Sequence, residues 1–226
     1  MMYGRLIERN AAIAKWIGTQ FPLIIFHEGN ISGEDQSFIE QFTPDLKFHW
    51  VPVSLKFLNG PDVPEETIRT FYDGSCYPGY HCMCEFHMCD VWDHLKEFDK
   101  VLRIDEDCII NGDWSTIFDT VSDESPYSTP TFDTETHELT NKTLSEWCPE
   151  YDRSMPYTNV FIAKMNMWFR SDIRAFTQEI KRNRGCIRFR WGDAPIHGLI
   201  LKKFSVPYTI MSKYSYFHGS HNRMVN

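Results

Sequence analysis

The sequence predicts an α/β protein with a mostly parallel central sheet flanked by helices. Apolar runs of strand length alternate with segments whose apolar residues recur every three or four positions, the spacing of a helix packed on a sheet. The 226 residues, of which 42% are hydrophobic, are enough for one compact domain with a substantial core. We therefore expect residues 1–226 to form a single domain.

The first third of the chain predicts a helix, a strand, a helix and a strand in that order. Leu6, Ile13 and Ile17 share one face of a helix over 6–17. The run Pro22–Phe26 is apolar throughout, which predicts a strand covered on both faces at the centre of a parallel sheet. Further elements are expected as a helix over 37–42, a strand over 47–53 and a helix that begins at 65–69.

The clearest helix is expected over 80–98, because one face is apolar at three- and four-residue steps: Cys84, Met88, Val91, Leu95 and Phe98. It leads into a strand over 100–104. The stretch 120–150 is rich in Ser, Thr and Pro and is expected to form a long loop. The last third is expected to contain a strand over 159–163, helices over 172–181 and from Asp193 onward, and a tail over 214–226 without regular structure.

Charge and cysteine usage exclude several classes of protein. The formal net charge is −8 and the chain has no long cationic run, which argues against a nucleic-acid partner. The longest apolar stretch, around 21–26, is far shorter than the about 20 residues that span a bilayer, and the N-terminus lacks the form of a signal peptide. Seven cysteines, an odd number, are typical of reduced thiols. We expect a soluble, cytoplasmic protein without a membrane span.

Two polar clusters stand where predicted strands end, which is the edge at which open α/β sheets bind ligands. His27–Asn30 follows the first strand, and Asp105 and Asp107 follow the strand over 100–104. Residues two apart in an extended segment point the same way, so these two carboxylates repel each other unless a cation lies between them. A divalent ion such as Mn²⁺ or Mg²⁺ fits, because it keeps coordination positions for phosphate oxygens. A solvated acidic turn is the alternative.

Three segments resemble, in the same order, the fungal α-1,2-mannosyltransferases of glycosyltransferase family 15: Gly79–Phe86, Val101–Asp107 and Arg190–His197. The family segments read Tyr-x-x-Met-Cys-Arg-Phe, Trp-Arg-Val-Glu-Pro-Asp and Trp-Gly-Asp-Ala-Pro-Val-His. The likeness extends over roughly residues 80–221. It implies a Rossmann-like GT-A fold, a nucleotide-diphosphate sugar as donor, a Mn²⁺ ion and retention of the anomeric configuration. GDP-mannose is the family's donor, and a UDP-hexose stays open for this chain.

The resemblance also implies the residues that bind donor and metal. Asp105 and Asp107 correspond to the family's acidic pair at the metal and the ribose. Tyr80 corresponds to a tyrosine near the donor, and Trp191 lies in the most specific of the three segments. Arg103 shares a strand face with Asp105, so we expect it to pair with a carboxylate or to reach the diphosphate.

Histidines at both ends of the chain are further candidates. A C-terminal histidine completes the metal shell in enzymes of the resembling family, and His218 and His221 are the two candidates here. We expect His218, because Gly219 after it lets the backbone come close to the diphosphate. His27 and Glu28 end the first strand, where GT-A enzymes hold the nucleoside, although a plain strand-exit turn explains them equally well.

Three positions depart from the family pattern. Glu85 replaces an Arg, so an ion pair there is lost or reversed, and Glu106 replaces a Pro. Phe161 stands where the family carries a candidate nucleophilic Glu, which excludes a covalent glycosyl-enzyme at this position. A retaining reaction would then use front-face return, in which the departing phosphate oxygen takes the acceptor proton.

The sequence as a whole predicts a metal-dependent glycosyltransferase that moves a hexose, such as mannose, onto a glycan. Its nucleotide-binding half is expected over 1–110 and its acceptor-binding half over 111–226. Asp193 is either a helix N-cap, a ligand for a sugar hydroxyl or the base of an inverting reaction. An inverting transferase, a non-catalytic nucleotide- or carbohydrate-binding module and a metal-dependent phosphoesterase are the alternatives. We expect a cytoplasmic enzyme or one domain of a larger viral or bacterial enzyme.

Overall fold

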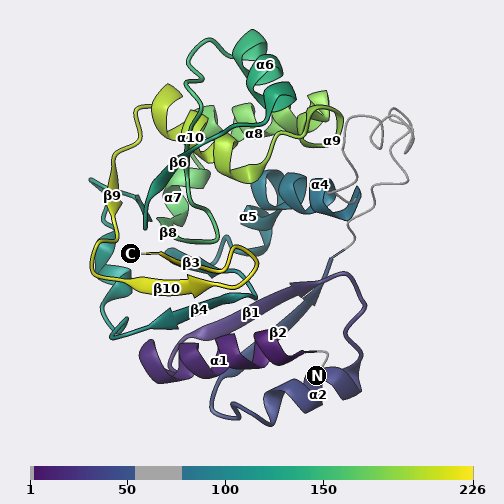
Figure 1. Cartoon of the computed structure of the whole chain (residues 1–226), viewed down its shortest axis with the longest axis vertical. Helices are drawn as coiled ribbons and strands as arrows, with labels where there is room; N and C mark the ends of the chain where they lie inside the picture. The colour runs from purple at the N-terminus through teal and green to yellow at the C-terminus, as the bar shows by residue number, and fades with distance from the viewer. Residues whose placement is uncertain (1–2, 54–77, 226) are drawn as a thin grey trace.

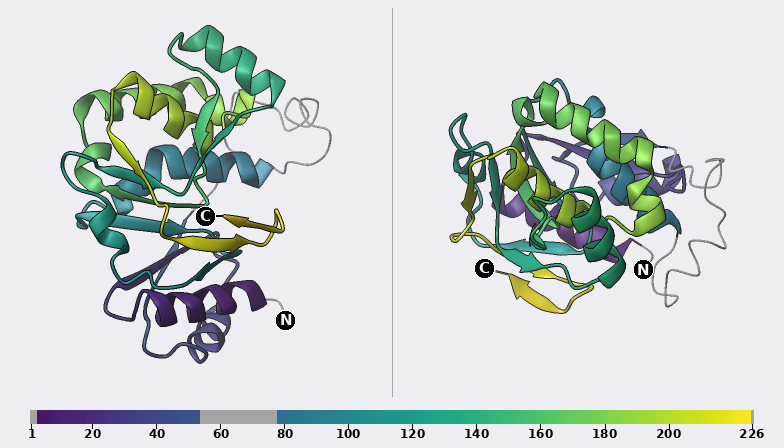
Figure 2. Two further views of the ribbon diagram at one scale, coloured as in Figure 1. Left: turned by 60° about the vertical axis from the view of Figure 1, so that its left-hand side comes forward. Right: turned by 90° about the horizontal axis from the view of Figure 1, so that it is seen from above.

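The computed structural model describes residues 3–53 and 78–225. Figure 1 shows the strands in the middle of the molecule, with helices α1 and α2 below them and the later helices above. Figure 2 shows the same layers from two other sides. The α/β class is therefore confirmed. The helix expected at 65–69 lies outside the described residues.

The strands form two small sheets and two larger ones. In the first sheet, β1 (Pro22–His27) pairs with β2 (Lys47–Pro52). The four-stranded sheet has the order β3, β8, β5, β9, with the bounds Lys100–Ile104, Val160–Lys164, Tyr127–Thr129 and Tyr208–Ile210. The three-stranded sheet has the order β11, β10, β4, with the bounds Arg223–Val225, Ser215–His218 and Cys108–Asn111. The last sheet pairs β6 (Phe132–Thr134) with β7 (Ser154–Pro156).

The pairing of these strands differs from the mostly parallel sheet that the sequence predicts. Among the described strands, β1–β2 and β5–β9 are parallel, and every other pair is antiparallel. The strand β1 pairs with β2 alone among the described strands, so it does not lie at the centre of a wide sheet. An alternation of strands and helices predicts the class of fold, but the choice of neighbour depends on contacts between distant parts of the chain.

The helices follow the predicted periodicity closely. α1 (Gly4–Trp16) and α8 (Ser171–Asn183) lie where the apolar spacing predicts them. α2 begins at Gly33, because Ser32 and Asp35 form a capping box there, and it ends at Glu40. The remaining described helices are α6 (Glu138–Trp147), α7 (Met165–Trp168), α9 (Gly185–Phe189), α10 (Asp193–Lys203) and the short 3-10 helix η2 (Ile117–Thr120).

The helix expected over 80–98 is a continuous helical segment in three parts. α4 (Pro78–Glu85) and α5 (Val91–His94) flank a single π-helical stretch, η1 (Phe86–Asp90). The helix ends earlier than expected, since Leu95 is no longer helical. Its predicted apolar face is buried: Cys84, Met88, Val91 and Leu95 are at most 5% exposed.

The stretch 120–150, expected as a loop, contains β5, β6 and α6. Its polar composition is misleading because β5 pairs with β8 on one side and β9 on the other. Ser128 and Thr129 in β5 are fully buried, and the Ser128 hydroxyl bonds to Thr209 across the sheet. Hydroxyl groups that are satisfied in this way can be buried at little cost.

The tail 214–226, expected to be irregular, contains β10 and β11. The strand β10 pairs antiparallel with β4 in a register that sets His218 opposite Cys108. This pairing carries the end of the chain back to the turn that follows β3. Tyr216 is fully buried between the neighbouring strands.

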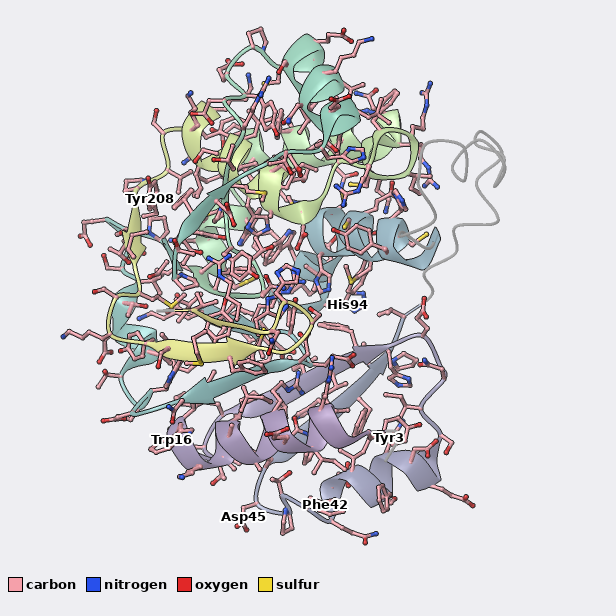
Figure 3. All side chains as sticks on the ribbon, in the orientation of Figure 1. Tyr3, Trp16, Phe42, Asp45, His94 and Tyr208 are labelled. Atoms are coloured by element: carbon pink, nitrogen blue, oxygen red, sulfur yellow. The ribbon has the colours of Figure 1, made fainter. Side chains whose placement is uncertain are left out.

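The described side chains form a dense aromatic core. Trp92 and Trp168 stack with ring centroids 3.9 Å apart, and both are at most 2% exposed. At the outer edges of the molecule in Figure 3 lie Phe42 and Tyr208, which are 48% and 47% exposed. The six described cysteines are buried and form no disulfide with one another. Within residues 3–53 and 78–225, no helix has the length and apolar character needed to cross a membrane.

Helix α10 crosses β7 so closely that one glycine has no room for a side chain. A Cβ atom on Gly198 would lie 2.0 Å from the backbone carbonyl oxygen of Ser154. We expect Gly198→Ala to lower the free energy of unfolding by about 3 kcal/mol, since backbone must move to relieve the overlap. Urea denaturation measures this loss. Gly33→Ala is the control, because a Cβ there meets no atom within 4 Å, and equal stabilities of the two variants would contradict the packing argument.

Candidate active site

Three strand ends meet around the turn 105–107. This turn joins β3 to β4, and its first residue is tied to the start of β8 because the Asp105 amide donates to the Asn159 carbonyl at 2.9 Å. The end of β10 lies beside the turn, since His218 pairs with Cys108. The Gly219 amide then donates to the carbonyl oxygen of Asp107 at 2.9 Å. The sequence predicts both the acidic pair and His218 here, and the structure brings them together.

Asp107 and His218 face each other across a short gap. The Oδ2 atom of Asp107 lies 3.6 Å from Nε2 of His218, whose side chain is 2% exposed. Burial lowers the pKa of His218, so its imidazole is neutral at pH 7 and the contact is not an ion pair. Burial tends to raise the pKa of Asp107, but hydrogen bonds from Ser220 outweigh it and hold the pKa below its usual value. A carboxylate oxygen therefore faces a neutral imidazole nitrogen.

This arrangement fits a divalent cation. Among the described residues, Asp107, Cys108 and His218 place one ligand atom each within 4.8 Å of one another. Burial and the neighbouring aspartates raise the pKa of Cys108, so its thiol stays protonated and is a poor ligand. A carboxylate oxygen and a neutral imidazole suit Mn²⁺ or Mg²⁺ better than a thiolate metal, and leave coordination positions for phosphate oxygens and water.

Asp105 lies beside this gap, and its carboxylate is bound by Arg103 and Asn159. Its Oδ1 accepts a hydrogen bond from Nε of Arg103 at 2.8 Å, and its Oδ2 accepts one from Asn159 at 3.0 Å. Nη1 of Arg103 donates at 2.6 Å to Oδ2 of Asp193. Arg103 therefore pairs with a carboxylate, as the sequence predicts, and it bridges two of them. The assignment of Asp105 as a direct metal ligand stays a prediction.

Asp193 is the first residue of α10, and Gly192 is the N-cap. The expected N-cap role differs from the structure, because the carboxylate of Asp193 turns to Arg103 and no side chain caps the helix. Burial alone would raise the pKa of Asp193, but the Arg103 guanidinium holds it at about 2. A carboxylate with so low a pKa is a weak base.

The site gathers three carboxylates with buried arginine and histidine side chains. Burial lowers the pKa of both His87 and His197 to about 3, so these imidazoles beside Asp193 are neutral. Arg103 pairs with Asp105 and Asp193, and Asp107 lies beside His218. A second guanidinium lies near Asp105, because the buried Arg9 donates to the Ile104 carbonyl oxygen at 3.1 Å.

Tyr80 and Trp191 differ in their exposure to solvent. Tyr80 is 38% exposed, and the Arg190 guanidinium lies 6.0 Å from its ring centroid. Trp191 is 2% exposed, and its indole nitrogen donates to the Thr143 hydroxyl at 2.8 Å. The indole therefore packs in the core with its polar atom satisfied. Contact of either residue with a donor stays a prediction.

His27 and Glu28 lie at the end of β1, apart from the carboxylate clusters. The His27 ring accepts a hydrogen bond from the Gly29 amide at 3.2 Å and packs edge-on against Trp50. Glu28 is exposed. Within the described part of the chain, no hydrogen bond or ion pair joins either residue to Asp105 or Asp107. Their nucleoside role stays a prediction.

Two of the positions that depart from the family pattern, Phe161 and Glu85, make contacts that the structure defines. Phe161 lies in β8, is 3% exposed and stacks on Tyr127 with ring centroids 5.4 Å apart. No carboxylate therefore stands at this position. Glu85 forms an ion pair with Arg184 at 2.9 Å, and whether this pair is the reverse of one in the family stays a prediction.

The sequence does not single out Asn159 and Tyr157 as site residues. Tyr157 lies two residues before the predicted strand over 159–163 and Asn159 is its first residue, and an antiparallel partner of β3 necessarily begins where β3 ends. That topological rule is the signal that would have found them. Ser220, whose amide binds Asp107, has no comparable signal in the sequence.

The architecture is that of known nucleotide-sugar enzymes. Core-mannan synthase A from Aspergillus fumigatus, solved with Mn and GDP, superimposes with a TM-score of 0.75 at 17% identity, over 96% of this chain and 71% of that one. The mannosyltransferase Ktr4p from S. cerevisiae gives a TM-score of 0.77 at 15% identity, over 96% and 67% of the two chains. The galactosyltransferase LgtC gives 0.59 at 13% identity, over 92% and 69%.

The chain has the GT-A fold. The GT-A architecture and the resemblance to fungal mannosyltransferases that the sequence predicts are thereby confirmed at the level of the fold. No family model and no curated sequence matches the chain. In the GT-A frame, the turn 105–107 after β3 is the point where the acidic pair of the sequence meets the C-terminal histidine.

Proposed function

We propose that this chain is a metal-dependent glycosyltransferase that moves a hexose from a nucleotide-diphosphate sugar to a glycan acceptor. One observation carries the proposal: the Asp107 carboxylate and the neutral His218 imidazole face each other at 3.6 Å, beside Asp105, on a GT-A fold. The carboxylate oxygen and the imidazole nitrogen both present lone pairs, so they do not attract each other unless a cation lies between them. Asp107 and His218 would hold that cation, and it would neutralise the charge that develops on a diphosphate leaving group.

Mn²⁺ and GDP-mannose are the proposed metal and donor. Support comes from the core-mannan synthase solved with Mn and GDP and from Ktr4p solved with GDP. A UDP-hexose is the alternative donor and Mg²⁺ the alternative metal. His27 and Glu28 are proposed to bind the nucleoside of the donor. Tyr80 and Arg103 are proposed to bind its diphosphate and sugar. This division assigns donor binding chiefly to residues 1–110 and acceptor binding to 111–226.

We propose retention of the anomeric configuration by front-face return. Phe161 supplies no nucleophile, so a covalent intermediate at that position is excluded. The bond from C1 to the phosphate oxygen breaks, the acceptor oxygen bonds to C1 from the same face, and the acceptor proton passes to the departing phosphate oxygen. Asp193 fixes Arg103 in this scheme and orients a sugar hydroxyl.

An inverting reaction with Asp193 as base is the second candidate mechanism. The geometry disfavours it, because Arg103 binds the carboxylate at 2.6 Å and holds its pKa at about 2. NMR of the product's anomeric proton distinguishes the two. A non-catalytic binding module would form no new glycosidic bond, and a phosphoesterase would release nucleotide without any acceptor.

Nucleotide binding is tested by thermal unfolding with a panel of nucleotides and nucleotide sugars in Mn²⁺. We expect the cognate nucleotide diphosphate to raise the melting temperature by about 5 to 10 °C at a hundredfold excess over its Kd. The nucleotide whose diphosphate gives this shift identifies the nucleotide part of the donor. A shift of equal size in EDTA would contradict the metal role, and the absence of any shift across the panel would contradict donor binding.

A further inference from the structure

The hydroxyl of Tyr157 lies between two histidines. It is 2.6 Å from Nδ1 of His218 and 2.6 Å from Nδ1 of His221. Tyr157 and His218 are 7% and 2% exposed, so water does not compete freely for the bond between them, whereas His221 is exposed. A hydroxyl has one proton and therefore donates to one imidazole and accepts from the other. The two Nδ1 atoms therefore differ: one carries no proton and accepts from the hydroxyl, and the other carries a proton and donates to it.

Asn159 decides which ring is the donor. Its Nδ2 lies 3.0 Å from Oδ2 of Asp105, and because a carboxylate oxygen accepts, this contact fixes the orientation of the amide. The same nitrogen lies 3.4 Å from Nε2 of His218, and the Ser220 hydroxyl lies 3.0 Å from that Nε2. The Nε2 atom thus faces an amide nitrogen that can only donate, so Nε2 accepts and its ring carries the proton on Nδ1.

The hydrogen bonds then run in one direction. Nδ1–H of His218 donates to the oxygen of Tyr157, and the Tyr157 hydroxyl donates to Nδ1 of His221. The Nε2 atom of His218 then carries no proton of its own and accepts from Asn159, and Oδ2 of Asp107 lies 3.6 Å from the same nitrogen. A cation bound between Asp107 and His218 would take the lone pair of this nitrogen in place of the amide. A histidine that binds a metal requires this state, with its other ring nitrogen held by a hydrogen bond.

We propose that Tyr157 is a positioning residue that holds His218 in the Nδ1–H tautomer, with His221 as the acceptor that gives the Tyr157 hydroxyl its direction. The inference rests on the metal site of the proposed function. It assigns different roles to the two C-terminal histidines: His218 is the ligand, and His221 acts through Tyr157. In the absence of that acceptor, the Tyr157 hydroxyl is free to donate to Nδ1 of His218, which moves the ring proton to Nε2.

Tyr157→Phe tests the inference, because it removes one oxygen and keeps the ring. We expect Mn²⁺ to bind about 10- to 100-fold more weakly, as measured by calorimetric titration with Mn²⁺ alone. His221→Ala is expected to weaken Mn²⁺ binding in the same direction. Tyr151→Phe is the matched control: Tyr151 is also 7% exposed, and its hydroxyl donates to Asn141, outside the site. Its Mn²⁺ affinity should equal that of the wild type.

Nitrogen NMR of the His218 ring in the metal-free protein provides a readout that does not depend on metal or transfer. We expect the Nδ1–H form in the wild type and a larger share of the Nε2–H form in Tyr157→Phe. An Nε2–H ring in the wild type would overturn the inference. If the wild type binds Mn²⁺ and Tyr157→Phe binds it equally well, the role of Tyr157 alone is refuted. If the wild type binds no Mn²⁺, the metal site of the proposed function is refuted, and with it the purpose of the tautomer.

Discussion

Asp107→Asn is expected to reduce glycosyl transfer about 1,000-fold or more, because the change removes the charged oxygen that would bind the cation at the diphosphate. The fold should survive, since an amide oxygen can still accept the hydrogen bond from the Ser220 amide. Transfer is measured with the donor that the thermal panel identifies. Mn²⁺ titration of the same variant should show a parallel loss of affinity.

Glu106→Gln is the control for this variant. Glu106 is exposed in the same turn, so the substitution removes one negative charge at the same place without touching the Asp107–His218 gap. It should keep most of the activity. Undiminished transfer by Asp107→Asn, or wild-type transfer that persists in excess EDTA, would refute the metal-dependent mechanism.

Arg103→Met is expected to lower the free energy of unfolding by about 3 to 5 kcal/mol, because it leaves two largely buried carboxylates without their cation. Arg103 is 13% exposed, and its partners Asp105 and Asp193 are 27% and 10% exposed. Urea denaturation at pH 7 measures the loss. The same variant should bind Mn²⁺–nucleotide weakly, since Asp105 no longer has a fixed position.

The stability that Arg103→Met loses should become smaller as the pH falls. In the wild type, the pKa of Asp193 is about 2 in the folded state, below its ordinary 3.8, so its contribution is present above pH 4 and is lost only between about 4 and 2. Burial already raises the pKa of Asp105 in the wild type against the opposing effect of Arg103. Without Arg103, the pKa of both carboxylates should rise further, and a raised pKa stabilises the folded state more at lower pH. The difference in the free energy of unfolding between the wild type and Arg103→Met should therefore decrease from pH 7 towards pH 4.

Arg170→Met provides the comparison for Arg103→Met. Arg170 pairs with Asp172 at 2.7 Å, but both side chains are more than 40% exposed, and such surface pairs contribute at most about 1 kcal/mol. A double variant, Arg103→Met with Asp193→Asn, should recover part of the stability because one orphaned charge is gone. If Arg103→Met costs no more than Arg170→Met, the buried cluster does not depend on the guanidinium.

Local pattern was enough to place most of the regular elements. The apolar spacing predicts α1, β1, β3 and α8 with small errors at their ends. The errors are larger where burial depends on a distant partner. Ser128 and Thr129 look like loop residues until β9, some 80 residues later, pairs with them. The register that makes them core residues is absent from any local window.

The sequence by itself placed the acidic pair, because Asp105 and Asp107 both follow directly on one predicted strand. It also placed Phe161 where a nucleophile would stand. The different partners of the two aspartates, Arg103 and Asn159 for Asp105 and Ser220 and His218 for Asp107, were decided by the tertiary structure. The sequence favours His218 over His221, and the antiparallel register of β10 on β4 sets His218 at the turn, while its role as a metal ligand stays a prediction. The partnership of His218 with Tyr157, 61 residues away, was decided by the tertiary structure. Hydrogen-bond direction and strand register depend on which distant segments pair, and local composition does not specify that choice.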